Sequence, residues 1–402
     1  MMSMAQAAPD DRRDVPDPGG QAAGGSAPAV AQAEPPLTEP AQAPAEEAAT
    51  PRRVRVAWFL SQATLDHFAR SLQSLAVGLL DELVEVTVVC RHGVDVAQLP
   101  SPPVELLRHG PLNWLLFETA AMPALLADLR SGKIDLVHSL DAPSAATADK
   151  VARRLDLPLA VNSLRLGDGR WLAPLARGAT VLAASEPIRQ DLLSRRAVRP
   201  ERLHLVRPGV YHVRHATCFD NPGCSTSIVA GGALEDFRAF QAVLQSFADL
   251  QACGHDCALF VLGEGRAERL LRAQADRLGL RAILTFIGPQ RLEQMLEIYK
   301  AADVYVAPVP SESVDMQALM AMAAGVPVLA AAGGADDFTI DGRTAQVFPV
   351  GDSLCLTTEL VALLEDRASA RAMAERALEY VRKLHSPAGA ATAVAGIYRR
   401  AL

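Results

Sequence analysis

The sequence predicts an α/β protein in which two doubly wound, Rossmann-like domains face each other across a cleft. From Val54 onward, short β-branched runs alternate with stretches of helical periodicity, which is the pattern of parallel sheets covered by helices on both faces. Turn residues grouped near residues 207–224 interrupt this alternation, as is typical of a domain boundary. With 402 residues, of which 50% are hydrophobic, the chain is long enough for two such domains.

The first domain is predicted over residues 54–210. Its candidate strands are Val54–Phe59, Val84–Cys90, Ile134–His138, Leu159–Asn162, Thr180–Ala184 and a weaker Leu203–Val206. Between the first two strands, the apolar residues of the segment 65–82 recur at helical spacing. An irregular linker over residues 211–226 follows, and it contains the turn Asn221-Pro222-Gly223. Strands and helices that alternate in this way predict one parallel sheet.

The second domain is predicted over residues 227–385. Its candidate strands are Ser227–Ala230, Ala258–Leu262, Ile283–Ile287, Val304–Pro308, Val326–Ala331 and Ala345–Phe348. Its candidate helices are Phe237–Leu250, Glu264–Leu278, Glu293–Ala302, Met316–Ala324 and Leu356–Leu384. A last helix over residues 386–402 is free to return to the first domain. Because ligands of open α/β sheets bind beyond the carboxyl ends of the strands, the functional site is expected in the cleft.

The first 53 residues are predicted to be a disordered tail rich in Ala, Pro and Gly. This segment has no aromatic residue and no apolar run, so it cannot bury enough surface to offset its ordering entropy. It also lacks the basic start and continuous apolar run of a secretory signal, which predicts a cytoplasmic protein. The apolar window Leu112–Leu126 contains Glu118 and Pro123 and is too short to span a bilayer. A half-buried amphipathic helix is the favoured interpretation, and a peripheral helix at the inner membrane surface is the alternative.

Charge and cysteine content exclude several classes of partner. The formal net charge is −7, so no overall basic field attracts nucleic acid. Six cysteines are scattered along the chain, and reduced thiols are expected in the cytoplasm. His212, His215, Cys218 and Cys224 are four potential zinc ligands, but their spacing matches no zinc pattern. The segment is therefore interpreted as linker, and neither a metal nor a cofactor is expected.

Short motifs in the second half occur in an order that resembles a known family. They are Gly231-Gly232, Gly263-Glu264-Gly265, Leu278-Gly279-Leu280, Phe286-Ile287-Gly288, Tyr299, Ala302-Asp303-Val304, Pro310-Ser311-Glu312, Ala321-Met322-Ala323, Gly325-Val326-Pro327-Val328 and Gly333-Gly334. In this order they resemble the donor domain of retaining glycosyltransferases with the GT-B architecture, in the large group related to sucrose synthase and bacterial mannosyltransferases (glycosyl transferases group 1). Weaker matches in the first half are Ile134–His138, Ala184-Ser185-Glu186 and Val206–Val210.

The resemblance implies transfer of a sugar from a UDP- or GDP-linked donor, with retention, to an unknown glycan, lipid or small-molecule acceptor. Negative charge grows on the departing diphosphate, and helix N-termini and cations suit it, whereas carboxylates suit sugar hydroxyls. Glu312 takes the position of the catalytic carboxylate that reaches the donor sugar. The residues implied in donor binding are Gly231, Arg238, Gly263, Gly265, Ser311, Ser313, Met316, Gln317 and Met320. The acceptor-side candidates are His138 and Asp141, at the end of a predicted strand.

Several positions depart from the family pattern. Ser313 and Asp315 stand where glycines are expected, and Met320 stands where a second carboxylate would hold the ribose. Gly232 replaces a cationic residue and Leu164 an acceptor-side histidine, which leaves Arg238 as the candidate phosphate ligand. An alternative hypothesis is therefore a catalytically impaired, glycosyltransferase-like binding or scaffold protein. A sugar-nucleotide epimerase is disfavoured by the order of motifs around Glu312.

Overall fold

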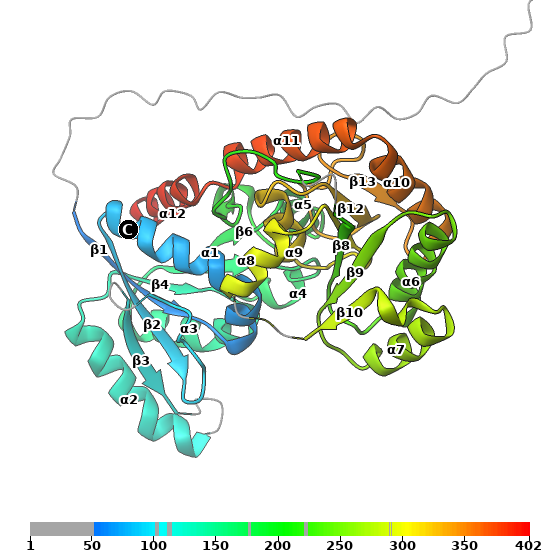
Figure 1. Ribbon diagram of the computed structural model, residues 1–402. Coiled ribbons are helices and arrows are strands. Elements are labelled where there is room, and N and C mark those ends of the chain that lie inside the picture. Colours follow the sequence, from blue (N-terminus) through cyan, green and yellow to red (C-terminus); the bar gives the residue numbers. More distant parts are fainter. Residues whose placement is uncertain are drawn as a thin grey trace, which may run out of the picture. The chain divides into compact units, whose positions relative to one another are not determined.

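Two parallel β-sheets, one in each half of the chain, form the framework of the protein (Figure 1). The computed structural model describes residues 52–100, 104–110, 115–175, 178–220, 224–288, 290 and 292–402. The predicted tail lies outside the described residues up to residue 51, and so does the turn at residues 221–223. The prediction of two doubly wound α/β sheets is confirmed.

The first sheet has the order β3-β2-β1-β4-β5-β6-β7. Its strands are β1 (Val54–Phe59), β2 (Val84–Arg91), β3 (Glu105–His109), β4 (Leu136–Ser139), β5 (Leu159–Ser163), β6 (Thr180–Ala183) and β7 (Leu203–Leu205). Its helices are α1 (Gln62–Asp81), α2 (Leu115–Ser131), α3 (Ala142–Leu155), α4 (Gly169–Leu172), α5 (Glu186–Ser194) and a 3₁₀ turn at Pro200–Arg202. Val56 of β1 pairs with both Val86 and Leu136. The strand order reverses between β1 and β4, which is where a crevice forms in such sheets.

The second sheet has the order β10-β9-β8-β11-β12-β13. Its strands are β8 (Thr226–Gly231), β9 (Cys257–Leu262), β10 (Leu284–Ile287), β11 (Val304–Ala307), β12 (Val328–Ala331) and β13 (Gln346–Phe348). Its helices are α6 (Phe237–Ala252), α7 (Glu268–Arg277), α8 (Leu292–Lys300) and α9 (Met316–Ala323), with a 3₁₀ turn at Leu280–Ala282. Every strand pair in both sheets is parallel. The order reverses again, between β8 and β11.

Strand β3 was not predicted, because its sequence lacks the continuous apolar run of a buried strand. It reads ELLRH, and only its last residue, His109, is buried. A strand at the edge of a sheet contacts one neighbour alone and exposes most of its side chains, so charged residues interrupt the apolar run. The same reasoning explains why the interior strand β1, with five of six residues buried, was easy to recognise.

Two predicted helices have different boundaries in the structure. The helix predicted over Leu356–Leu384 is two helices, α10 (Ser353–Glu365) and α11 (Arg367–Leu384). Asp366 separates them and caps α11, because its side chain accepts a hydrogen bond of 2.9 Å from the N–H of Ser369. The helix predicted from Glu264 begins only at Glu268. Gly263 and Gly265 form the preceding turn, which delays the helix.

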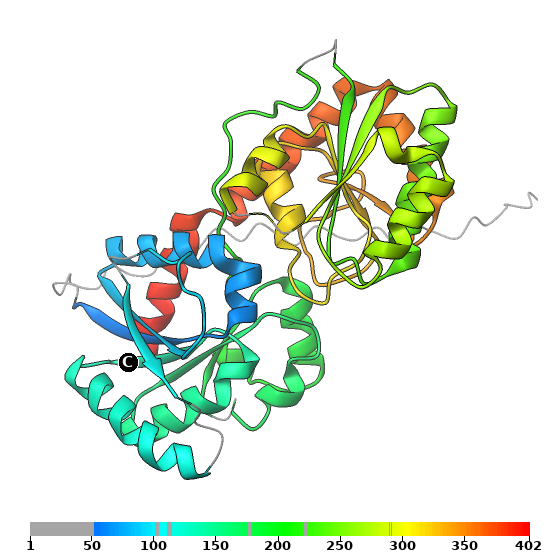
Figure 2. The ribbon, with the colours of Figure 1, turned by 60° about the horizontal axis from the view of Figure 1, so that its bottom comes forward.

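Helix α12 (Pro387–Ala401) lies beside α1 in the first half of the chain (Figures 1 and 2). Gly78 permits this close packing, since a Cβ atom there would lie 2.8 Å from the Cβ of Ala391. Deeper in the core, the indole N–H of Trp58 donates a 3.0 Å hydrogen bond to the hydroxyl of Tyr398. The end of the chain is thus part of the first domain's core.

Helix α2 covers residues 115–126 of the apolar window that left a membrane alternative open, and residues 112–114 lie outside the described residues. Met122, Leu125 and Leu129 are buried, which is the spacing of one helical face. Within the part of the chain that the structure describes, no helix has both the length and the apolar character that a bilayer-spanning segment needs.

Candidate functional site

A cavity of about 380 Å³ lies at the carboxyl ends of β8 and β11. It brings together five of the residues implied in donor binding, namely Gly231, Ser311, Met316, Gln317 and Met320. Residues of α1 in the first domain, Asp66, His67, Ala69 and Arg70, also line it. The cavity therefore stands at the carboxyl edge predicted for the site, and both domains contribute to its wall.

Gly231 is required at the base of this cavity. An added Cβ would overlap the hydroxyl of Tyr305 and lie 2.5 Å from Oε1 of Gln317. The Tyr305 hydroxyl donates a 3.2 Å hydrogen bond to that same Oε1. The buried tyrosine thus orients the Gln317 amide at the cavity, and only glycine leaves room for the pair.

Asp315 occupies the N-terminus of α9, where phosphate would otherwise be expected to bind. Its Oδ1 accepts hydrogen bonds from the N–H groups of Gln317, at 2.9 Å, and Ala318, at 3.1 Å. The first free amides of the helix therefore already bind a carboxylate. A donor diphosphate at this cavity needs cationic partners from elsewhere.

A second carboxyl group, that of Asp336, lies directly against Asp315. The N–H of Asp315 donates a 2.8 Å hydrogen bond to Oδ1 of Asp336. Burial raises the pKa of Asp315, and burial together with the charge of Asp315 raises the pKa of Asp336 to about 8. The two buried carboxyl groups together therefore bind a proton more readily than two free carboxyl groups would.

His67 and the cation Arg70 reach the cavity from α1, and the sequence reasoning missed both. His67 and Arg70 both line the cavity, and the charge of His67 acts against the rise in the pKa of Asp315. Arg238, the predicted phosphate ligand, is exposed at the start of α6 and is not among the described lining residues. The only sequence signal was the polar face of α1, on which Asp66 and Arg70 lie one turn apart.

Methionine side chains form the apolar part of the wall. Met316 is 5% exposed, and Met320 is half-buried at the position where a ribose carboxylate was expected. A thioether adapts its shape to an apolar ligand face but accepts hydrogen bonds only weakly. Gln317, about one turn earlier on α9, offers a strong hydrogen-bonding group in the same wall.

Glu312, the predicted catalytic residue, points to the first domain in this structure. Its carboxylate pairs with the guanidinium of Arg165 at 2.8 Å, and both side chains are largely exposed. Its carbonyl accepts a 2.8 Å hydrogen bond from the N–H of Leu166, and Arg165 and Ser313 form an antiparallel bridge. The loop that carries Glu312 therefore docks on residues 164–168. Its contact with a donor sugar stays a prediction.

Ser313 follows Glu312 in the same loop and is not among the described lining residues of the cavity. Its N–H donates a 3.1 Å hydrogen bond to Oγ of Ser311. Its own Oγ is buried and has no hydrogen-bond partner among the described residues. Ser311 is the member of this pair that lines the cavity.

Gly263 and Gly265 are needed for a close approach between two loops. A Cβ at Gly263, where φ is +145°, would overlap the carbonyl oxygen of Gly232, and one at Gly265 would overlap the carbonyl group of Leu234. Neither glycine is among the described lining residues. Their contact with the donor stays a prediction, whereas their steric role is clear.

His138 is buried in the first domain and connects it to α12. Tyr398 accepts a hydrogen bond from Trp58, so its own hydroxyl hydrogen points to Nδ1 of His138 at 2.6 Å. Nε2 of His138 then donates to Oδ1 of Asn162 at 2.9 Å. Burial lowers the pKa of His138 to about 4, so the ring is neutral at pH 7. Its predicted place on the acceptor side stays a prediction.

Asp141 joins the N-termini of α1 and α3. Its Oδ2 accepts hydrogen bonds of 2.6 Å from the N–H of Ser61 and from Oγ1 of Thr64. Its Oδ1 accepts from the N–H of Ser144, at 2.8 Å, and from the Ser144 hydroxyl, at 2.6 Å. Four protein donors satisfy this carboxylate. An acceptor contact would have to replace one of them.

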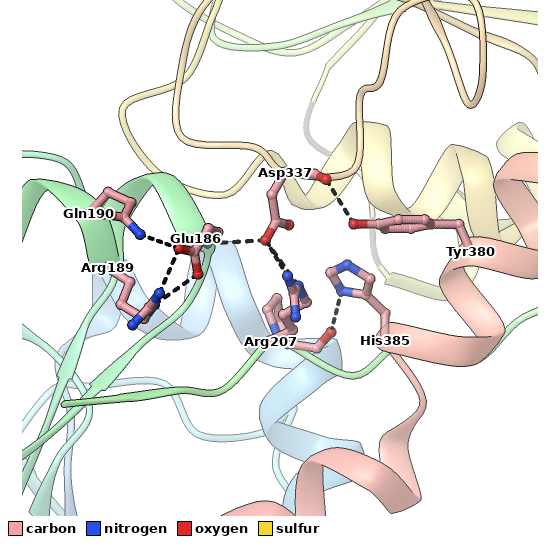
Figure 3. Close-up of polar contacts among 8 residues, drawn as sticks. Glu186, Arg189, Gln190, Arg207, Asp337, Tyr380 and His385 are labelled. Atoms are coloured by element: carbon pink, nitrogen blue, oxygen red, sulfur yellow. Dashed lines mark hydrogen bonds and ion pairs between the residues drawn. The ribbon is translucent and has the colours of Figure 1, made fainter. Parts of the chain in front are cut away.

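A polar cluster connects the second domain to the first (Figure 3). Asp337, which follows β12, accepts hydrogen bonds from the N–H of Glu186, at 3.0 Å, and from the Arg207 guanidinium, at 2.8 and 2.9 Å. Tyr380 donates to the backbone carbonyl of Asp337 at 2.8 Å, and His385 donates to the carbonyl of Pro208 at 3.0 Å. Asp337 thereby supplies the negative charge at the N-terminus of α5.

The His and Cys residues of the linker are not gathered into a site. Across the described residues, no group of three or more His, Cys, Asp or Glu side chains could hold a metal ion. Cys218 is buried, and Cys224 is exposed.

Two family models match the chain. Residues 225–366 match the model described as glycosyl transferases group 1, and residues 68–214 match the model described as glycosyltransferase family 4. Together the two matches leave out only residues 1–67, 215–224 and 367–402.

The chain is similar to D-inositol 3-phosphate glycosyltransferases of several bacteria. The protein of Corynebacterium aurimucosum is 28% identical over 301 residues, which is 69% of this chain and 68% of that protein. The protein of Corynebacterium glutamicum is 27% identical over 247 residues, which is 57% of this chain and 59% of that protein. The protein of Nocardia farcinica is 33% identical over 158 residues, which is 37% of this chain and 35% of that protein. The chain thus spans about a third to two thirds of the length of these curated relatives.

Solved structures share the fold. Alr3699/HepE of Anabaena in complex with UDP and glucose has a TM-score of 0.69 at 17% identity, covering 86% of this chain and 100% of that one. The sucrose-phosphate synthase of Thermosynechococcus elongatus has a TM-score of 0.68 at 19% identity, covering 87% and 99%. A glycosyltransferase of Rickettsia africae has a TM-score of 0.72 at 12% identity, covering 87% and 98%. At these identities the likeness concerns the fold alone.

Proposed function

The chain belongs to the group 1 glycosyltransferases of the GT-B fold, and we propose that it transfers a sugar from a nucleotide-sugar donor to an acceptor hydroxyl with retention of configuration. One observation carries the proposal. The cavity at the carboxyl ends of β8 and β11 gathers Gly231, Ser311, Met316, Gln317 and Met320, which are scattered in the sequence, and adds polar residues of α1 that include Arg70. The complex of the Anabaena protein with UDP and glucose favours a UDP-linked donor.

The donor is proposed to lie with its diphosphate toward α1. Arg70 and His67 then face the phosphates, because Asp315 already occupies the amides of α9. The ribose lies against Met320, and the amide of Gln317 binds its hydroxyls. Arg70 stabilises the charge that grows on the departing diphosphate, which is a larger effect in a cavity than in water.

In the proposed reaction, the acceptor oxygen forms a bond to the anomeric carbon as the bond from that carbon to the diphosphate breaks. The hydroxyl proton leaves with the diphosphate, so atoms and charge balance. Glu312 exchanges its partner Arg165 for hydroxyls of the donor sugar. The two partners are exposed, so this exchange costs little.

A second candidate is a binding protein that has lost turnover. The observation that favours it is the cap of Asp315 on α9, together with a methionine in place of the ribose carboxylate. Such a protein binds the nucleotide but does not cleave the sugar from it. Binding and turnover therefore have to be measured separately.

Isothermal titration with UDP and with GDP tests the binding step. We expect one of the two nucleotides to bind, and we expect Gly231→Ala to weaken it at least tenfold because the new Cβ displaces Tyr305 and Gln317. Gly288→Ala is the matched control, since nothing lies within 4 Å of a Cβ there. No heat with either nucleotide at millimolar concentration would overturn the proposal. Nucleotide binding without release of UDP or GDP from any sugar donor supports the second candidate instead.

A further inference from the structure

Three methionine side chains line the cavity at the carboxyl ends of β8 and β11, and they come from two helices that pack against each other. Met295 lies on α8, whereas Met316 and Met320 lie one turn apart on α9. Met295 and Met320 are both partly exposed. The sulfur atom of methionine can be oxidised, which distinguishes this wall from one built of leucine.

The other methionines of the described chain are buried. Their exposed fractions are at most 5%, and they are Met122, Met316, Met322 and Met373. Met295 and Met320 are therefore the described methionines that solvent reaches most easily, and both line the cavity. An oxidant dissolved in water thus meets the accessible thioethers of the described chain at one place.

Hydrogen peroxide is an oxidant that converts a thioether to a sulfoxide without help from the protein. A lone pair of the sulfur attacks one peroxide oxygen, so an S–O bond forms as the O–O bond breaks. The second oxygen takes the proton of the first and leaves as water. Sulfur loses two electrons and the peroxide gains them, which gives methionine sulfoxide. What the protein controls is access to the sulfur.

A sulfoxide changes the charge distribution of the cavity wall. It replaces a weak hydrogen-bond acceptor with a polar group whose oxygen carries partial negative charge. Among the described lining residues, Arg70 is the only arginine or lysine, and the carboxylates are those of Asp66, Glu235, Asp236 and Asp315. A further negative oxygen in this wall repels an anionic ligand.

Gln317 is the polar neighbour of Met320 that oxidation affects most directly. Its Oε1 accepts a 3.2 Å hydrogen bond from the hydroxyl of Tyr305, so its Nε2 is the group left to bind a ligand. Residue 320 follows three positions later on α9, and side chains three apart on a helix are neighbours. A sulfoxide oxygen on Met320 therefore competes with the ligand for the Gln317 amide.

We propose that Met320, together with Met295 on the adjacent α8, is an oxidation site through which hydrogen peroxide closes the cavity to its anionic ligand. Enzymatic reduction of the sulfoxide returns the thioether and reopens the cavity. That the ligand is a nucleotide rests on the proposed function. The oxidation sites do not, because they stand on the access of solvent to two sulfur atoms.

Peptide mass spectrometry after brief treatment with hydrogen peroxide tests the oxidation sites. In the folded protein we expect Met295 and Met320 to gain oxygen about tenfold faster than Met122, Met322 and Met373, because the latter three are buried. In urea, where burial is lost, all five should react at similar rates. Similar rates in the folded protein would overturn the two sites.

Titration with UDP before and after peroxide treatment tests the closure. Cys224 and Cys253 are exposed and also react with peroxide, so dithiothreitol is added to reduce their sulfenic acids and disulfides, which leaves methionine sulfoxide unchanged. We expect oxidation to weaken UDP binding about tenfold and methionine sulfoxide reductase to restore it. Met320→Leu should lose this response, each protein being compared with its own untreated sample. Met373→Leu, which removes a buried thioether outside the cavity, is the matched control and should respond as the parent does.

Three outcomes would contradict the closure. They are unchanged UDP affinity in protein whose Met320 is fully oxidised, an equal response to peroxide in folded Met320→Leu, and full recovery in dithiothreitol alone, which assigns the change to cysteine. Thermal melting shows whether Met320→Leu is folded. Met320→Gln, which places a polar group there without an oxidant, should weaken UDP binding in untreated protein. If untreated parent protein does not bind UDP, the proposed function falls, and peptide mapping still decides the oxidation sites.

Discussion

Asp337 and Arg207 form an ion pair between the second domain and the first, with 2.8 Å between Oδ2 and Nη2 (Figure 3). Their side chains are only 11% and 21% exposed, and the same Oδ2 accepts from the N–H of Glu186. One carboxylate thus satisfies a guanidinium and the N-terminus of α5 together. Other interdomain pairs, such as Arg165 and Glu312, are far more exposed.

We expect Asp337→Ala to lower the free energy of unfolding by about 2–3 kcal/mol, because it leaves a half-buried guanidinium and a helix N–H without a partner. Urea unfolding of the parent protein, Asp337→Ala, Arg207→Met and the double variant gives the coupling energy. A coupling above about 1 kcal/mol is expected. If the losses of unfolding free energy in the two single variants simply add up in the double variant, the ion pair does not stabilise the protein.

The stability of the protein should fall below neutral pH because of His138. Burial holds the pKa of His138 at about 4 in the folded state, whereas an unfolded histidine titrates near 6.5. The unfolded state therefore binds more protons between pH 6.5 and 4, so stability is complete above pH 6.5 and is lost as the pH falls through this window. The loss is about 3 kcal/mol at pH 4 for one such residue.

Denaturant titrations at pH 7.5, 6, 5 and 4 measure this loss, and His138→Gln is the comparison. The variant lacks the titrating ring. Unfolding of the variant should therefore take up as much as one proton less than unfolding of the parent protein, so its free energy of unfolding should vary less with pH. His385, whose pKa burial also lowers to about 4, contributes equally to both proteins. An unchanged pH dependence in His138→Gln would refute the assignment.

Glu312→Ala should abolish turnover and leave UDP affinity within about twofold. The carboxylate is assigned to the donor sugar and lies outside the cavity that is assigned to the nucleotide. Arg165→Ala removes its present partner and should change the unfolding free energy by less than about 0.5 kcal/mol, since the pair is exposed. A large loss of UDP affinity in Glu312→Ala would contradict the assignment to the sugar.

Arg70→Gln should weaken UDP binding about tenfold, which corresponds to about 1.4 kcal/mol. The physical reason is the loss of a cation that faces the diphosphate in a cavity of low polarity. Arg238→Gln is the matched control, because Arg238 is exposed and is not among the described lining residues, so it should change UDP affinity less than twofold. A larger loss of UDP affinity in Arg238→Gln than in Arg70→Gln would indicate that Arg238 is the phosphate ligand. Titration at two salt concentrations tests the electrostatic origin.

Gly263→Ala should lower the unfolding free energy by about 3 kcal/mol or more. The new Cβ would overlap the carbonyl of Gly232 on a backbone with φ of +145°, which L residues rarely adopt. Gly288→Ala, with open space around its Cβ, should change stability by less than about 1 kcal/mol. Thermal melting of the two variants gives the comparison. Similar melting temperatures would show that the two loops can separate without cost.

Motif spacing pointed to residues on one side of the proposed donor cavity and not on the other. Gly231, Ser311 and Met320 belong to a strand, a loop and a helix whose order is read directly along the chain, and the structure places them together. Arg70 was missed because its role depends on packing between two domains rather than on local pattern. A polar face on an amphipathic helix has the same appearance whether it meets solvent or a ligand.

The sequence by itself determined the α/β class, the interior strands and the order of the donor motifs, because buried parallel strands need continuous apolar runs and tight turns need glycine. Tertiary structure alone decided that His67 and Arg70 of α1 line the proposed donor cavity and that Asp337 pairs with Arg207 between the two domains. The reason is physical. Each of these depends on the distances between side chains of different strands and helices. It also depends on burial, which shifts the charge of titratable groups. A local sequence pattern contains neither kind of information.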